Sequence, residues 1–79
     1  MLSIVIPARN AGAHLIRTLP LLAATGVADE VVVAVADSSD DSAATARRFG
    51  AAVIAAPRGR GLQLRAGAIA ARGEWLLFL

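Results

Sequence analysis

Three short segments of this sequence carry side chains that could bind a ligand. The first is Pro7-Ala8-Arg9-Asn10, and the second, Asp37-Ser38-Ser39-Asp40-Asp41-Ser42, places three carboxylates within five residues. The third is Pro57-Arg58-Gly59-Arg60-Gly61. An Asn amide both donates and accepts hydrogen bonds, carboxylates hold divalent cations or accept from ribose hydroxyls, and paired Arg guanidinium groups clamp phosphate oxygens. These residue types favour phosphate binding at the third segment.

Each segment also has a structural interpretation. Pro7 can end a strand with Asn10 as a turn residue, and this alternative is favoured for the first segment taken alone. Residues 40–42 suit the amino end of a helix, where side-chain oxygens accept amide hydrogen bonds and carboxylates meet a positive dipole. Asp37 directly follows an apolar run and is therefore the better functional candidate. The third segment can instead be a solvated basic loop, while two Arg-Gly steps without aromatic residues are a weak nucleic-acid signal.

The elements that position these segments follow from hydrophobic patterning. Four apolar runs cover residues 2–6, 31–35, 52–55 and 75–79, and three of them are nearly continuous, as strands buried on both faces of a parallel sheet are. Three segments of helical length separate them, at residues 12–24, 41–49 and 61–72. The β-α-β-α-β-α-β pattern predicts an α/β fold with a parallel, doubly wound, Rossmann-like sheet and right-handed crossovers. All strands then end at one carboxyl edge, where ligands of such folds bind.

Several residues predict how the elements begin and end. Pro7 should end the first strand sharply, and Pro20 should kink or restart the first helix. Gly50 suits the stop of the second helix. In the third helix, an apolar stripe of Leu62, Ala66 and Ile69 should face the sheet.

Composition narrows the function classes. A chain of 79 residues is one small domain or part of a larger one. Without Cys there is no disulfide and no Cys-based metal site, and the single His14 argues against a His-rich metal site. The isoelectric point near 11.2 arises because all cationic residues are Arg and Tyr is absent, while the net charge is only +2. We therefore expect no nucleic-acid partner.

The amino-terminal run has no positive residue before it, unlike a secretory signal, and no run is long enough to span a membrane. The expected compartment is therefore the cytoplasm.

The element count leaves part of the sheet uncovered. If the first two helices cover one face and the third covers the other, much of the second face is bare, which requires a covering partner. The chain also stops within the strand-like run 75–79. We therefore expect residues 1–79 to be the amino-terminal part of a larger domain, whose remainder or a partner chain covers the open face.

These segments together resemble the amino-terminal half of family 2 glycosyltransferases, which have a GT-A fold. The four matching segments lie in the family's order and spacing along essentially the whole chain: Ser3-Ile4-Val5-Ile6-Pro7-Ala8-Arg9-Asn10; Glu30-Val31-Val32-Val33 leading to Asp37-Ser38-Ser39-Asp40; Pro57-Arg58-Gly59-Arg60-Gly61-Leu62-Gln63-Leu64-Arg65-Ala66-Gly67; and Ala70-Ala71-Arg72-Gly73-Glu74-Trp75-Leu76-Leu77-Phe78-Leu79. A dinucleotide-binding domain would instead need its Gly-rich loop after the first strand, and a Walker loop would need Lys.

The resemblance implies a function and a set of contacts. Family members transfer a sugar from a nucleotide-diphosphate donor to an acceptor, with Mn²⁺ or Mg²⁺ and with inversion of the anomeric centre. The acceptor is unspecified and could be presented at a membrane surface. By similarity, the nucleotide-sugar-binding residues are Pro7, Ala8, Asn10, Asp37, Arg58 and Arg60. In that set Asp37 reads the base and Arg60 contacts the nucleotide.

The sequence departs from the family pattern at four places. Asn10 is followed by Ala11 where Glu is common, Val35 occupies the usual acidic position unless the register shifts to Asp37, and Arg65 stands where Asn is common. The Asp-x-Asp motif that holds the metal in the family follows a strand like 75–79 and is absent here. We therefore expect no catalytic residue and no metal ligand in this chain. The alternatives to a glycosyltransferase fragment are a non-catalytic nucleotide or anion-binding module and an inactive remnant.

Overall fold

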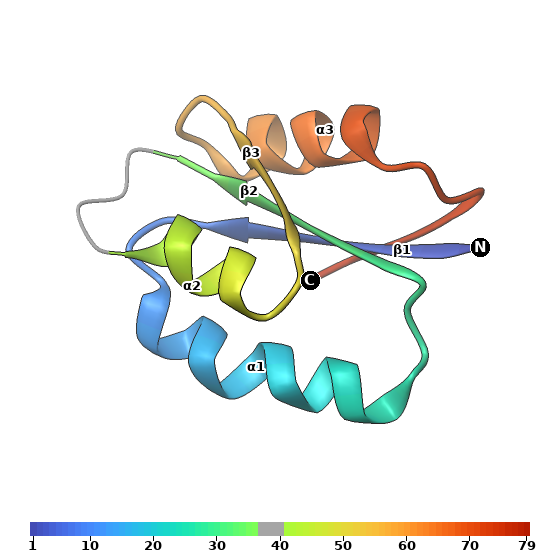
Figure 1. The fold of residues 1–79 in the computed structure, drawn as a ribbon. Coiled ribbons are helices and arrows are strands. Elements are labelled where there is room, and N and C mark those ends of the chain that lie inside the picture. The colour runs from blue at the N-terminus through green and yellow to red at the C-terminus, as the bar shows by residue number, and fades with distance from the viewer. Residues whose placement is uncertain (37–40) are drawn as a thin grey trace.

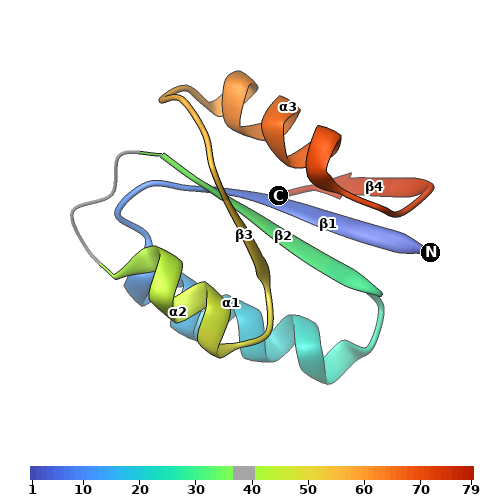
Figure 2. The ribbon, with the colours of Figure 1, turned by 45° about the horizontal axis from the view of Figure 1, so that its top comes forward.

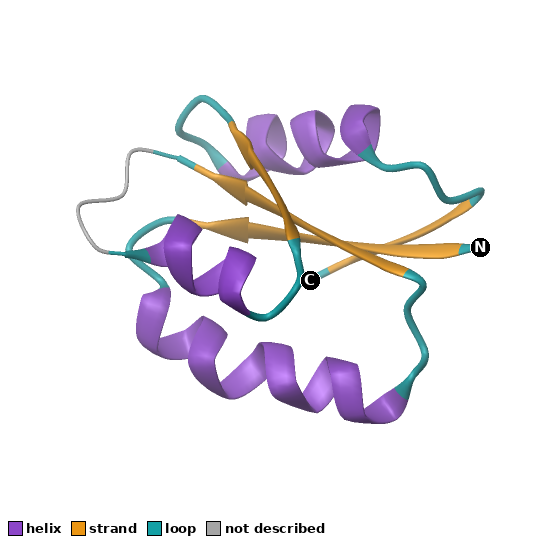
Figure 3. Cartoon of the chain, viewed as in Figure 1, coloured by secondary structure: helices purple, strands orange, loops and turns teal. Residues whose placement is uncertain are grey.

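The computed structural model describes residues 1–36 and 41–79. Strands and helices alternate along the described chain (Figure 3). They are β1 (Leu2–Ala8), α1 (Gly12–Thr25), β2 (Glu30–Val35), α2 (Ser42–Arg48), β3 (Ala52–Ala55), α3 (Arg60–Ala70) and β4 (Trp75–Phe78). This order confirms the predicted α/β pattern.

The four strands form one parallel sheet in the order β3-β2-β1-β4 (Figure 2). In the register, Val5 lies beside Val32 of β2 and Phe78 of β4. The chain leaves β1 towards β2 and later returns to the other side of β1, so the strand order reverses between β1 and β4. The carboxyl ends of all four strands consequently share one edge, where the loops after β1 and β3 also lie.

The helices divide between the two faces as expected, with α1 and α2 on one and α3 on the other (Figure 1). The core between the sheet and the first two helices is built from Ile4, Ile6, Leu15, Leu19 and Val33, each no more than 5% exposed. Apolar burial of this kind contributes roughly 25 cal/mol for each Å² removed from water.

Pro7 does not end the first strand. β1 continues through Pro7, which pairs with Ala34, to Ala8, which pairs with Val35. The amide of Leu79 donates to the Val5 carbonyl across the β1–β4 ladder, at 3.0 Å. Alternate residues of a strand face opposite neighbours, so Pro7 also faces β4, and its missing N–H interrupts only that ladder. The pairing with β2 is unaffected, and the strand runs on.

The helix ends differ in part from the expectations. Helix α1 passes Pro20 without restarting. Gly50, at φ 84°, stops α2 as predicted: its amide donates to the Arg47 carbonyl, and the Ala51 amide donates to the Ala46 carbonyl. At the other end of α2, residue 41 is the N-cap, but its side chain makes no capping hydrogen bond.

Ser42, also expected to act as a cap, accepts a hydrogen bond from the Ala11 amide instead, at 2.9 Å. Its hydroxyl therefore joins the loop after β1 to α2. Asp40, the third residue expected at this cap, lies outside the described residues.

The predicted apolar stripe of α3 is wrong. Leu62 is 51% exposed and Ile69 is 76% exposed, whereas the buried residues of the helix are Gln63 and Gly67. A Cβ added at Gly67 would collide with Cγ1 of Val5. The absence of a side chain at Gly67 therefore lets the helix lie directly on β1, and the line through Gln63 and Gly67 faces the sheet.

Strand β4 is exposed on both faces, which extends the predicted bare surface. Its four residues are all exposed, with Trp75 71% accessible. Trp75 and Leu77 share the face of Ile4, and Leu76 and Phe78 share that of Val5. Among the described residues, no helix is long and apolar enough to cross a membrane.

We predict that Gly67→Ala destabilises the fold by about 1–3 kcal/mol, because the added methyl group overpacks the contact with Val5. The matched control is Gly61→Ala in the same helix, where a Cβ meets nothing within 4 Å. That change should stabilise the chain by roughly 0.5–1 kcal/mol through helix propensity. Urea unfolding followed by circular dichroism measures both. Equal effects of the two substitutions would contradict the close contact.

Candidate functional site

The loop after β1 opens the carboxyl edge of the sheet. Arg9 and Asn10 are exposed, and Asn10 has a φ of 52°. This left-handed conformation is uncommon for residues with a side chain, but Asn adopts it more readily than most. The next amide, that of Ala11, is held by the buried Ser42 hydroxyl. The loop is therefore fixed to α2, and residue Asn10 is exposed at the surface.

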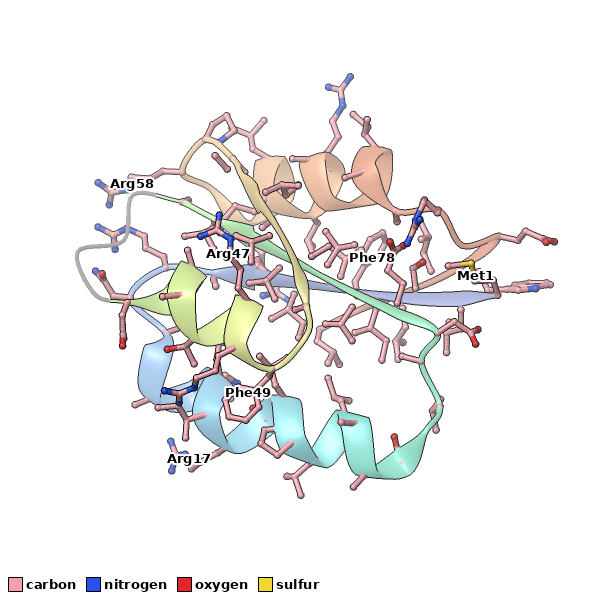
Figure 4. The ribbon with its side chains drawn as sticks, viewed as in Figure 1. Met1, Arg17, Arg47, Phe49, Arg58 and Phe78 are labelled. Atoms are coloured by element: carbon pink, nitrogen blue, oxygen red, sulfur yellow. The ribbon has the colours of Figure 1, made fainter. Side chains whose placement is uncertain are left out.

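The arginine segment lies at the same edge, where α3 begins. Gly59 is the N-cap of α3 with a φ of 126°, a conformation that side chains rarely allow. Arg60 is the first residue of the helix, and its guanidinium donates to the Leu79 carbonyl at 2.8 Å. Arg58 is exposed at the end of the molecule opposite Met1 (Figure 4). Two guanidinium groups therefore accompany the positive end of a helix.

The register explains why the Leu79 carbonyl is available to Arg60. Because the Leu79 amide donates to Val5, the next hydrogen bond of the parallel ladder would run from residue 7 back to the Leu79 carbonyl. Pro7 has no N–H to donate. The Arg60 guanidinium takes that place. Pro7 thus affects this edge because it lacks a backbone N–H, so the Leu79 carbonyl accepts from Arg60 and not from β1.

Gln63 belongs to this edge, although the sequence prediction gave it no role. Its side chain is 5% exposed, and its Nε2 donates to the carbonyls of Ala8, at 3.1 Å, and Ala34, at 3.0 Å. The signal that could have found it is its spacing four residues before Gly67, which places both on one helix face. A polar residue on the buried line of a helix needs partners, and here the strand ends supply them.

The structure places five of the six predicted site residues at one edge. Pro7 is half-buried and Ala8 is 1% exposed, so Ala8 offers backbone rather than side-chain contacts. Asn10, Arg58 and Arg60 are exposed at the surface. The sixth, Asp37, lies outside the described residues. The assignment of these residues to nucleotide-sugar binding remains a prediction.

The described residues do not fit a metal site. Among residues 1–36 and 41–79 there is no group of three or more His, Cys, Asp or Glu side chains that could hold an ion. The carboxylate of Asp29 accepts a hydrogen bond from the Leu2 amide at the opposite edge of the sheet, and His14 lies 3.3 Å from the Thr18 hydroxyl.

The amino edge of the sheet carries a polar network. Glu30 accepts hydrogen bonds from the Ser3 hydroxyl and the Arg72 amide, both at 2.8 Å, and forms an ion pair with the Arg72 guanidinium at 3.1 Å. The Ser3 oxygen in turn accepts from the Gly73 amide. This network joins the starts of β1 and β2 to the segment before β4.

The hydrogen bonds from the Arg72 amide and the Ser3 hydroxyl lower the pKa of Glu30, against the opposing effect of burial, and the Arg72 guanidinium adds to the lowering.

A hollow of about 300 Å³ also opens at this edge, and its lining includes Leu19, Ala51, Glu30 and Arg72. It lies away from the arginine segment. Both features therefore belong to the side of the sheet opposite the candidate site.

We predict that Glu30 stabilises the fold at neutral pH and that this contribution disappears in acid. Because the folded-state pKa lies below the ordinary value of about 4.3, the stabilisation is complete above that pH. It is lost as the pH falls through the lowered folded value. Urea unfolding between about pH 7 and pH 3 should show a smaller acid loss for Glu30→Gln than for the wild type. The exposed Glu74→Gln variant is the control, and identical pH profiles for Glu30→Gln and the wild type would contradict the prediction.

The fold defines a class: an all-parallel, Rossmann-like sheet with alternating helices, as in GT-A domains. The family model described as "Glycosyl transferase family 2" matches residues 3–79. The chain therefore belongs to glycosyl transferase family 2, and the predicted family and fold are confirmed. A search of curated proteins finds no match.

Solved structures of two kinds of glycosyltransferase are similar to this chain. Glucosyl-3-phosphoglycerate synthase from Mycobacterium tuberculosis, in complex with Mn²⁺, uridine diphosphate and glucosyl-3-phosphoglycerate, matches all of it with a TM-score of 0.87 and 24% identity. The same enzyme with Mn²⁺, uridine diphosphate and phosphoglyceric acid matches with a TM-score of 0.79 and 26% identity.

Mannosyl-3-phosphoglycerate synthase from Rubrobacter xylanophilus matches 70% of the chain, with a TM-score of 0.53 and 30% identity, over 19% of its own length. The chain spans 32% of the length of the glucosyl-3-phosphoglycerate synthase structures. It therefore corresponds to about a third of the glucosyl-3-phosphoglycerate synthase chain.

Proposed function

We propose that the carboxyl edge of the sheet binds the nucleoside diphosphate of a sugar donor for glycosyl transfer to an acceptor, and that residues 1–79 are the nucleotide-binding, amino-terminal portion of a GT-A glycosyltransferase domain. The observation that carries the proposal is the position of Arg60, which begins α3 beside the reversal point between β1 and β4. Ligands of open α/β sheets bind at such points.

The electrostatics of the edge suit a diphosphate. The amides of the first turn of α3 have no partner within the helix, and the aligned peptide dipoles place partial positive charge there. A guanidinium has five N–H donors, so those of the exposed Arg60 that do not point at the Leu79 backbone oxygen can meet an anion. Arg58 precedes it in the same segment, and planar guanidinium groups bind phosphate oxygens in pairs.

The nucleoside would lie towards the loop after β1. In this proposal the exposed Asn10 side chain contacts the nucleoside, and Pro7 and the backbone of the buried Ala8 border it. Asp37, which the resemblance assigns to the base, follows β2 in sequence. The bound uridine diphosphate of the similar mycobacterial structures supports a nucleotide donor.

We propose a divalent cation only for longer members of the family. The similar mycobacterial structures contain Mn²⁺. The resemblance assigns the ion to an Asp-x-Asp segment, and the described part of this chain gathers no comparable ligands. This chain then contributes a positive helix end and two guanidinium groups to binding of the sugar donor. We propose the cytoplasm as the compartment and no nucleic acid as a partner.

We predict that Arg60→Ala weakens binding of uridine diphosphate at least about tenfold, because a charge-assisted pair with phosphate contributes about 1.5–3 kcal/mol. Isothermal titration calorimetry with the 79-residue chain measures the affinity. The control is Arg17→Ala, an exposed arginine on α1, which lies on the other face of the sheet from α3 (Figure 4). A wild-type chain without measurable affinity, or equal losses in the two variants, would count against the site.

We also propose that further polypeptide of the same domain covers β4. Its side chains are exposed on both faces, and the similar structures have about three times the length of this chain. The 79-residue chain alone should then associate through this surface. Analytical ultracentrifugation tests this, with Trp75→Lys and Leu77→Lys as variants expected to reduce association. A monodisperse wild-type monomer would refute the proposal.

A further inference from the structure

Gln63 is buried at a place where an apolar residue would be the simpler choice. It lies in the second turn of α3, faces the sheet and is 5% exposed. Burying an amide costs free energy unless its polar atoms are paired. The two carbonyl partners of Nε2 belong to different strands, since Ala8 ends β1 and Ala34 is the penultimate residue of β2. The Gln63 side chain thus connects the carboxyl ends of β1 and β2 on the face of the sheet that α3 covers.

The two partners fix the orientation of the amide. Both acceptors are carbonyl oxygens, so the nitrogen of Gln63 must face them and the oxygen must point elsewhere. The Ala8 carbonyl also accepts the Ala36 amide at 3.0 Å, so Gln63 adds a second hydrogen bond to an existing ladder. The sheet does not need Gln63 for pairing, and the additional bonds instead tie α3 to the strand ends.

Arg60 completes this arrangement from the preceding turn of the same helix. It lies three residues before Gln63 and donates to the Leu79 carbonyl next to β4. Two side chains therefore connect the start of α3 to three neighbouring strand ends: Gln63 to those of β1 and β2, and Arg60 to that of β4. Asn10 lies two residues after Ala8. The hydrogen bond from Gln63 to Ala8 therefore links the loop after β1, through α3, to Arg60.

We propose that Gln63 is the positioning residue of this edge, which holds the loop after β1 and the Arg60 guanidinium at a constant separation so that one nucleoside diphosphate contacts both. The proposal rests on the proposed function, because it concerns the same site. Gln63 itself contributes no charge to the ligand. Its effect is on the geometry that the ligand meets, and preorganised sites bind more tightly because less ordering accompanies binding.

The first test compares Gln63→Met, which keeps the shape and removes the donor, with Leu19→Ala, which destabilises the core on the opposite face. Calorimetry with uridine diphosphate is performed where both variants are folded by circular dichroism. Gln63→Met should bind about tenfold more weakly or worse, and Leu19→Ala should bind as the wild type does. A similar loss in both variants would show a merely structural role and overturn the proposal.

The second test uses Gln63→Glu, whose carboxylate cannot donate to the two carbonyls at neutral pH. Burial beside carbonyl oxygens raises the pKa of such a carboxyl group, and its protonated form restores one donor. Relative to the wild type at each pH, affinity for uridine diphosphate should recover as the pH falls from about 8 to about 5. A ratio that does not change with pH would contradict positioning through Nε2.

A third measurement separates this proposal from the proposed function. Amide hydrogen exchange requires no ligand, and Gln63→Met should accelerate exchange of the Ala36 and Leu79 amides about tenfold relative to Leu19→Ala. The Trp75 amide, which donates to the Met1 carbonyl at the opposite edge, should exchange alike in the two variants. If the wild type binds no nucleotide but the exchange pattern holds, the proposed function fails and the positioning role stands. Unchanged exchange at Ala36 and Leu79 would overturn the positioning role.

Discussion

The contact between Gly67 and Val5 sets the distance between α3 and the sheet, and the candidate site depends on that distance. Only a residue without a side chain lets the helix lie against β1 here. At this separation the Gln63 amide, one turn earlier, reaches carbonyls of both β1 and β2. One turn earlier still, the Arg60 guanidinium reaches the Leu79 carbonyl. A thicker packing layer would move both side chains away from the strand ends.

The carboxyl edge also depends on a donor that is missing. Pro7 keeps its place in the pairing with β2 but cannot donate towards β4. The carbonyl of Leu79 then accepts a hydrogen bond from Arg60 rather than from the strand. The arginine is thereby held at the surface by a backbone oxygen, which restrains its side chain. Such a restrained cation loses less conformational entropy on meeting an anion than a freely moving one.

Patterning and glycine positions were sufficient to predict the order of the elements, the parallel sheet and the stop of α2 at Gly50. The edge that carries the candidate site followed from topology alone. The buried face of α3 could not be predicted, because hydrophobicity favoured Leu62 and Ile69 while the tertiary contact at Gly67 selected Gln63. The continuation of β1 past Pro7 depends on which neighbour that residue faces, and a single sequence does not contain this information.

The exposed strand β4 and the candidate site are adjacent, because Arg60 contacts the residue that follows β4. Arg60 binds the carbonyl that follows β4, so any polypeptide that packs on the exposed Leu76 and Phe78 lies beside the guanidinium. Leu62 is also exposed, in the turn of α3 that begins with Arg60. Covering these apolar side chains would also exclude water from around the arginine, and a lower local dielectric strengthens its attraction for a phosphate. In the proposed function, burial of β4 would therefore strengthen diphosphate binding at the same helix start.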